Sequence, residues 1–252
     1  INNKLTLDIS EISEFSNSSE IAFDYSLLGL DNIQTLKLNF FQEKNYAENI
    51  KKMNIKDLSK YSFLKINNLS KTITINSGNH IINKPLIIPS NYNLKIEPGT
   101  KINISKTGKI ISYGPINFLG NENNKIHINS DTSSQGIVIL NAKDVSNINF
   151  VKFSNLSNID YAGIINTGAL TFYNSDLVIK NSVIENSNSE DAINIVHSKF
   201  LIDNLIVINS KSDAIDLDFS NGIIKNSLFK NNGNDGIDVS AGIVKIENVK
   251  IQ

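Results

Sequence analysis

The sequence predicts an all-β protein, a right-handed parallel β-helix in which coils of about 22 residues stack on one another. Three observations lead to this fold class. Four segments align without gaps and begin 23, 22 and 22 residues apart. Each is rich in isoleucine, valine or phenylalanine and is broken by asparagine, serine or glycine, and none has a helical periodicity. A leucine-rich repeat of similar period would show leucine-dominated positions and a helical segment, so it is disfavoured.

The N-terminal part, residues 1–70, lacks this texture and is predicted to be a small mixed region that caps or links the β-helix. Between Asn45 and Leu64, apolar residues recur at spacings that fit an amphipathic helix. These residues are Ile50, Met53, Ile55 and Leu58.

Residues 71–252 are predicted to form the β-helix, with room for roughly eight coils. The stretch NLKIEPGTKINI (93–104) alternates apolar and polar residues on both sides of a Pro-Gly turn signal. The last repeat, DGIDVSAGIVKIEN (235–248), comes near the end of the sequence and no cap follows it. We therefore expect either a partner over this end or a β-helix truncated at its C-terminus.

The three preceding repeats are GALTFYNSDLVIKN (168–181), DAINIVHSKFLIDN (191–204) and DAIDLDFSNGIIKN (213–226). Alternation along each strand predicts that matching apolar residues point inward and stack. They form two rows, Ile193, Ile215, Ile237 and Ile195, Leu217, Val239. The asparagines that end the repeats are expected to stack in a turn and to share hydrogen bonds between coils. They are Asn181, Asn204, Asn226 and Asn248.

Outward-facing residues between these isoleucines form two polar columns. One column reads Thr171, Asn194, Asp216, Asp238, and its neighbour reads Tyr173, Val196, Asp218, Ser240. Three carboxylates therefore converge on one face, at separations of about 5 to 7 Å. Such a group can be a solvated surface, can bind a sugar or Ca²⁺, or can supply the acid and base of glycoside hydrolysis. We assign Asp216, Asp218 and Asp238 as candidate catalytic residues, and Asp216 and Asp238 as candidate Ca²⁺ ligands.

Two further features bear on binding. About ten extra residues interrupt the period around Asn155–Asn166. Loops that project from a solenoid often frame a groove, so Asp160 and Tyr161 are candidate sugar contacts, together with Tyr173 and Asn194.

The repeated strand-entry aspartates Asp191, Asp213 and Asp235 are expected to bond backbone amides in their turns. His197 matches Asn174 and Phe219 at a strand end, which indicates a packing or turn role rather than a metal ligand.

Composition narrows the function classes. The 24 basic residues nearly balance the 25 acidic ones, so no nucleic-acid partner is expected. There is no cysteine, which excludes disulfides, thiolate metal sites and a cysteine nucleophile. There is no arginine. No apolar run reaches the ~18 residues of a membrane span. No cofactor is indicated apart from the candidate Ca²⁺.

The run from GALTFYNSDLVIKNS through GNDGIDVS resembles the right-handed β-helix regions of the pectin-lyase-like superfamily. It is more similar to those of bacterial exported proteins, some of which carry the β-helix behind a spore-coat-H-like kinase domain. No kinase motif is visible, so that activity is not implied. In polygalacturonases an aspartate pair at the spacing of Asp213 and Asp235 is catalytic, but the histidine and arginine motifs of that family are missing.

The resemblance implies an exported or cell-surface β-helix module, with further domains beyond the ends of this sequence. The leading hypothesis is that it binds a polysaccharide or surface glycan, or serves as a scaffold. The alternative is a polysaccharide hydrolase or lyase that uses the outer aspartates, so whether the chain is an enzyme stays open.

Overall fold

The structure is a computed structural model of the 252-residue chain, and it describes residues 20–25, 34–39, 58, 60–105, 107–131 and 136–252. The chain divides into two compact units, Ile1–Asn45 and Tyr46–Gln252. In the first unit, β1 (Glu20–Tyr25) and β2 (Gln34–Asn39) form an antiparallel pair. Most of the helix expected between Asn45 and Leu64 lies outside the described residues.

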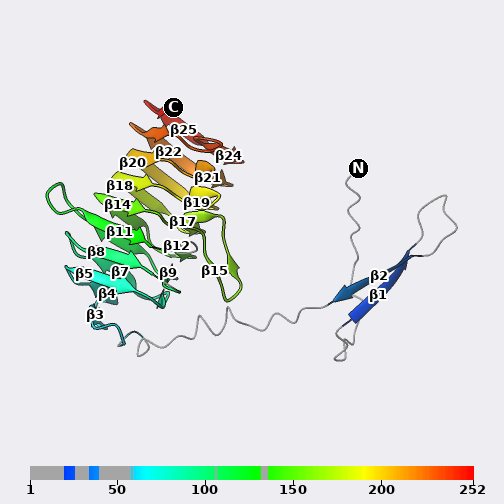
Figure 1. Cartoon of the computed structure of the whole chain (residues 1–252), viewed down its shortest axis with the longest axis horizontal. Coiled ribbons are helices and arrows are strands. Elements are labelled where there is room, and N and C mark those ends of the chain that lie inside the picture. Colours follow the sequence, from blue (N-terminus) through cyan, green and yellow to red (C-terminus); the bar gives the residue numbers. More distant parts are fainter. Residues whose placement is uncertain (1–19, 26–33, 40–57, 59, 106, 132–135) are drawn as a thin grey trace. The chain divides into compact units, whose positions relative to one another are not determined.

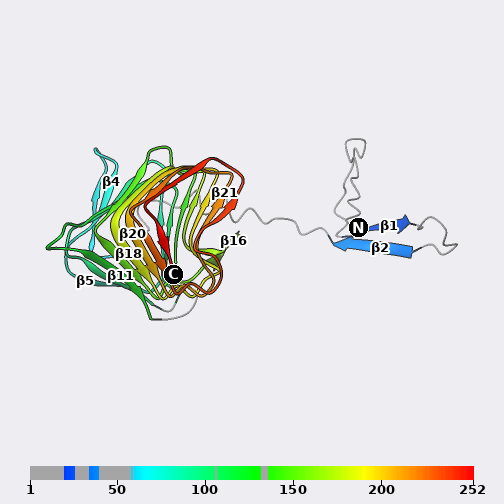
Figure 2. The same ribbon diagram turned by 90° about the horizontal axis from the view of Figure 1, so that it is seen from above.

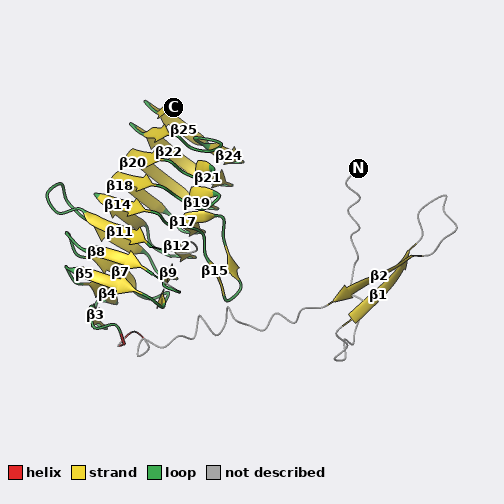
Figure 3. Cartoon of the chain, in the orientation of Figure 1, coloured by secondary structure: helices red, strands yellow, loops and turns green. Residues whose placement is uncertain are grey.

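The second unit is a parallel β-solenoid of about eight turns, which confirms the predicted β-helix. Almost all of its regular structure is strand (Figure 3). Successive coils overlie one another when they are viewed along the stack (Figure 2). Side-chain bonds between adjacent coils join residues 22 or 23 positions apart in the last repeats. The strands form three faces, which we call A, B and C.

Face A contains β4 (Thr72–Ile75), β7 (Asn93–Ile96), β10 (Ile116–Leu119), β13 (Ser146–Asn149), the first halves of β18 (Leu177–Glu185) and β20 (Lys199–Ile208), β22 (Asn221–Lys225) and β25 (Val244–Glu247). Face B contains β5 (Asn79–Ile82), β8 (Lys101–Ile104), β11 (Ile126–Ser130), β14 (Val151–Ser154), the second halves of β18 and β20, β23 (Leu228–Lys230) and β26 (Lys250–Ile251). Face C contains β6 (Pro85–Ile88), β9 (Lys109–Ser112), β12 (Ile137–Leu140), β17 (Gly168–Tyr173), β19 (Asp191–Val196), β21 (Asp213–Asp218) and β24 (Asp238–Ser240). Figure 1 shows the strands of these faces rising in sequence order through the solenoid.

The core fills the inside of the coils with stacked apolar rows. Ile193 pairs in register with Ile215, and Ile195 with Leu217, and all four side chains are fully buried. The inward rows are therefore placed as predicted. At the first coil, β3 (Leu64–Asn67) runs antiparallel to β4 and covers that end of the core. At the last coil, Val239 stays partly exposed because only one neighbouring coil packs against it.

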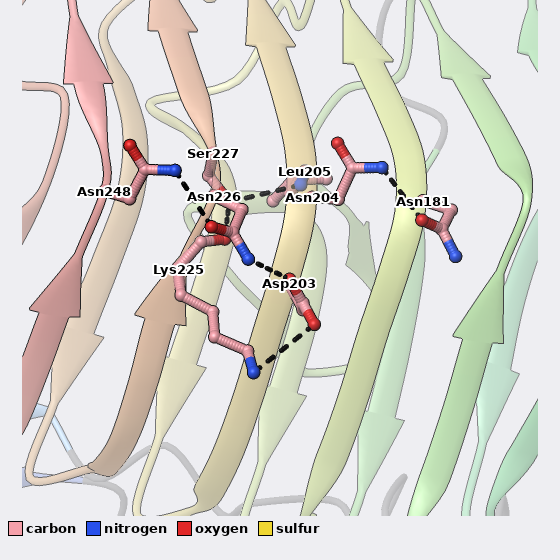
Figure 4. A network of polar contacts seen from close by, with 8 residues as sticks. All are labelled: Asn181, Asp203, Asn204, Leu205, Lys225, Asn226, Ser227 and Asn248. Carbon is pink, nitrogen blue, oxygen red and sulfur yellow. Dashed lines mark hydrogen bonds and ion pairs between the residues drawn. The ribbon is translucent and has the colours of Figure 1, made fainter.

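The corners between faces turn through residues with positive φ, most of which are asparagine. Asparagine tolerates this left-handed conformation better than most side chains do. Side-chain amides then bond from coil to coil, from Asn204 to Asn181 at 2.8 Å and from Asn248 to Asn226 at 2.9 Å. The predicted ladder has one break, because Asn226 donates to Asp203 in the coil below instead of to Asn204 (Figure 4). Lys225 also pairs with that carboxylate, at 3.5 Å.

A row of buried serines follows the corner residues, and sequence reasoning did not identify it. The hydroxyl of Ser198 donates to the carbonyl of Val196 and accepts the backbone N–H of Ser175 in the coil below, both at 2.8 Å. The N–H of Ser198 is in turn accepted by Ser220 at 3.1 Å. The row satisfies backbone groups that the turn takes out of the strand ladder.

Candidate functional site

One outward column runs the whole length of face C, and its character changes along the stack. The column is continuous in the strand register, and from the first coil upward it reads Ile87, Ile111, Val138, Thr171, Asn194, Asp216, Asp238. Its lower part is apolar and its upper part is polar. The second predicted column, Tyr173, Val196, Asp218, Ser240, is also in register beside the upper part. The structure thus brings together the three aspartates that the repeat predicted.

The ten-residue insertion covers the apolar part of this column. It forms a short hairpin, β15 (Asp160–Tyr161) with β16 (Ile164–Ile165), beside the strands of face C (Figure 1). Ile159 is buried in a cluster with the apolar column residues, and the ring of Tyr161 packs against that cluster. The ammonium of Lys109 lies 4.9 Å from the centroid of the Tyr161 ring. The hairpin therefore converts an outward apolar stripe into a second small core.

Asp160 and Tyr161 consequently lie beside Lys109 of β9, and three strands separate β9 from β21, which carries Asp216. Their predicted contact with a sugar stays a prediction. The other two predicted binding residues, Tyr173 and Asn194, lie in the two polar columns.

Asn166 closes the hairpin where the covered part of the column ends. Its amide nitrogen donates to the carbonyl of Gly168 and to the hydroxyl of Thr171, both at 2.6 Å, and its oxygen accepts the N–H of Ile159 at 2.6 Å. Thr171 is thereby held by the hairpin. Asn194 of the next coil is also buried, at 5% exposed, so the part of face C that stays open to solvent starts one coil further, with Asp216.

The open part begins at Asp216, which is hydrogen-bonded to the buried Asn194 in the coil below. The amide of Asn194 donates to Oδ2 of Asp216 at 2.7 Å. Burial raises the pKa of Asp216 to about 6, with further increases from the carboxylates of Asp218, Asp238 and Asp213 and an opposing effect of Asn194. Asp216 therefore exchanges its proton near neutral pH, as a general acid or a ligand-sensing group would.

The row of strand-entry aspartates lies next to this pair, and its members differ. Asp213 accepts the N–H of Asp235 on Oδ1 at 2.7 Å, so it bonds a backbone amide of the next coil, whereas the repeat predicted an amide of its own turn. Asp191 is only 2% exposed, and its Oδ2 has no hydrogen-bond partner among the residues that the structure describes. Burial, together with the nearby Asp216, raises the pKa of Asp191 to about 7. Sequence reasoning missed this difference because the three residues occupy identical repeat positions.

An aromatic edge borders the polar columns at the corner between faces C and A. The ring of His197 stacks on that of Phe219, with centroids 5.0 Å apart, and meets Tyr173 edge-on at 6.0 Å. Tyr173 and Phe219 are 43% and 60% exposed. Asn174, His197 and Phe219 occupy equivalent positions with positive φ, which confirms the turn position predicted for His197. The sequence signal for this edge was the change from asparagine at Asn174 to His197 and then Phe219 at the same repeat position.

No family model, curated protein or solved structure matches this chain. In the part of the chain that the structure describes, no three histidine, aspartate or glutamate side chains are grouped to hold a metal ion. Ca²⁺ between Asp216 and Asp238 stays a prediction for that pair. No described helix is long and apolar enough to span a membrane.

Proposed function

We propose that this chain is a glycan-binding β-helix module of an exported or cell-surface bacterial protein, in keeping with its resemblance to the pectin-lyase-like superfamily. The binding surface is the open part of face C, which consists of Asp216, Asp218 and Asp238 with the buried amide of Asn194 behind them, together with the aromatic edge of Tyr173, His197 and Phe219. We call this area the upper face C surface.

The chemistry of a sugar fits this combination. Sugar hydroxyls donate hydrogen bonds to carboxylates, and with amides they can act as donors or as acceptors. The C–H faces of the sugar ring are apolar and pack on aromatic rings. Carboxylates in two columns provide the polar contacts, and three rings along one edge provide the apolar ones. A few placed polar groups beside apolar contact area are typical of ligand sites.

The observation that carries the proposal is the backbone strain at the aromatic edge. Phe219 has a φ of 49°, a conformation that costs a bulky residue of the order of 1 kcal/mol or more. The equivalent corner of an earlier coil uses Asn174, which adopts the same conformation more readily. A strained and largely exposed phenylalanine contributes little to folding, and so its value to the protein lies in what its ring contacts.

The test is the substitution Phe219→Asn. We expect the stability of the solenoid to stay within about 1 kcal/mol of the parent chain, because relief of strain offsets the lost ring stack. Affinity for a bound oligosaccharide should fall roughly tenfold, which corresponds to about 1.4 kcal/mol. Oligosaccharides that bind are first identified by NMR shifts of Tyr173 and His197 across a glycan panel, and titration calorimetry then compares the two chains.

The matched control is Phe150→Asn. Phe150 also has a positive φ, 52°, but it lies between β13 and β14, at the corner between faces A and B. This variant should bind as the parent does. Equal loss of affinity in both variants, or no shift with any glycan of the panel, would contradict the proposal.

Hydrolysis is the second candidate function, and one observation favours it. Asp216, with its pKa of about 6, could hold the proton of a general acid while a neighbouring carboxylate stays ionised as the base. If the surface is catalytic, release of reducing ends from a bound glycan should drop at least ~100-fold in Asp216→Asn. A rate that is unchanged in this variant excludes the assignment of Asp216.

A further inference from the structure

We propose that the glycan recognised by the upper face C surface carries free amino groups, as an oligomer of unacetylated glucosamine does. This inference rests on the proposed glycan-binding function and names the class of ligand. It is argued from the charge of the surface, from a buried carboxylate behind it and from the aromatic edge.

The carboxylates of this surface have no cationic partner within the described residues. Elsewhere on the solenoid, acidic side chains pair with lysines, as in Lys152 with Glu185 at 2.7 Å, Lys225 with Asp203 at 3.5 Å and Lys245 with Glu247 at 2.6 Å. The chain is nearly neutral overall, with 24 basic and 25 acidic residues. Counter-charges are thus available to the fold, but no ion pair is formed on the upper face C surface.

The groups around Asp216 also favour a positively charged ligand. Its electrostatic neighbours are the carboxylates of Asp218, Asp238 and Asp213, and among the described residues its side chain accepts a hydrogen bond from the uncharged amide of Asn194. Like charges at this spacing repel one another, at a cost that only a cation or bound protons can remove. A ligand that brings a positive charge would therefore gain more here than a neutral one.

A second, independent observation is the buried carboxylate of Asp191. It is 2% exposed, lies one coil below Asp213, and has an oxygen, Oδ2, that finds no hydrogen-bond donor in the described part of the chain. Its electrostatic neighbours are again acidic, namely Asp216, Glu190 and Asp213. The acidic character of the surface thus continues into the wall behind it, where Asp191 adds a further negative charge once the pH rises above its pKa of about 7, and the charged groups that act on Asp191 include no basic one among the described residues.

The aromatic edge suits the same ligand. Ammonium groups bind over aromatic faces within about 6 Å of the ring centroid. Phe219 stacks on His197 with one face and is 60% exposed, so ring surface remains for a ligand. A sugar with a carboxylate group would instead be repelled by the aspartates. Free amines on a sugar ring satisfy both parts of the surface.

The experiment compares three oligosaccharides of equal length by titration calorimetry with the full chain. They are an oligomer of unacetylated glucosamine, its fully N-acetylated form and a neutral glucose oligomer, all at a pH just above the pKa of about 6 of Asp216. We expect the amine form to bind at least ~10-fold more tightly than the acetylated form, with a preference that weakens as salt is added. The double variant Asp216→Asn, Asp238→Asn should reduce this preference to about one.

Glu185→Gln is the matched control, because it removes a carboxylate that lies on face B and already pairs with Lys152. It should keep the preference for the amine form. If the parent binds all three oligomers with equal affinity and Phe219→Asn loses this binding, the inference is overturned and the proposed function still stands. An amine preference that survives the double aspartate variant would also overturn it, since the amine would then bind elsewhere. Absence of binding by every oligomer would overturn both.

Discussion

Replacing Asp191 with asparagine should make the solenoid more stable at ~pH 8, even though the change removes a side chain that is almost completely buried. The folded chain raises the pKa of Asp191 from 3.8 to about 7. A raised pKa in the folded state means that the protonated form favours folding. The contribution is complete at a pH below the unfolded value, and it is lost as the pH rises through about 7. At ~1.36 kcal/mol per pKa unit, the loss approaches roughly 4 kcal/mol.

The measurement is urea unfolding at ~pH 5 and ~pH 8. The parent chain should lose stability between the two, whereas Asp191→Asn should lose much less and exceed the parent at the higher pH by roughly 2 kcal/mol or more. Asp235→Asn is the matched control, because it is the same substitution at the exposed member of the row, and it should keep the parent's pH dependence. The raised pKa of Asp191 would be contradicted if the parent's free energy of unfolding were the same at both pH values. It would also be contradicted if Asp191→Asn were less stable than the parent at the higher pH.

Truncating Phe172 to alanine should have the largest destabilising effect among single changes near the site. The ring is fully buried and pairs in register with Ile139 below and Ile195 above. Removing it leaves a cavity that the neighbouring coils cannot fill, and such changes cost about 3 to 5 kcal/mol. Because each coil packs only on its neighbours, removal of the ring weakens the packing of the coil that contains β17 against the coil below and the coil above.

The effect is measured as a shift in the urea midpoint, with Phe219→Ala as the matched control. Both variants remove the same ring, but Phe219 is 60% exposed, so its loss should change stability by less than about 1 kcal/mol. Similar losses in the two variants would mean that the inward row does not carry the stability of the solenoid.

The repeat in the sequence was sufficient to predict the coil, the inward rows and the outward columns. Strand register is fixed where one face is buried, so Asn194, Asp216 and Asp238 had to align once the isoleucines did. The asparagine ladder followed in the same way. Its break could not be predicted, because the choice of Asn226 between Asn204 and Asp203 depends on side-chain geometry inside the corner.

The covering role of the insertion can be predicted from the sequence of face C. Strands buried on both faces show continuous apolar runs instead of alternation, and PLII (85–88) and IVIL (137–140) are such runs. They indicate that something covers the outside of face C in these coils. The burial and raised pKa of Asp191 could not be predicted from the sequence, because burial differs between coils whose sequences match.

The two rows of side chains at the corners also differ in polarity. Among the described residues, every asparagine-to-asparagine side-chain bond between coils donates from a coil to the one before it, as Asn204 does to Asn181. In the serine row the backbone N–H donors point the other way, as the N–H of Ser175 does to the hydroxyl of Ser198. Neighbouring rows therefore carry opposed dipoles that partly cancel along the axis. A solenoid held in this way can grow by whole coils without building up the terminal partial charges that the macrodipole gives to the ends of an α-helix.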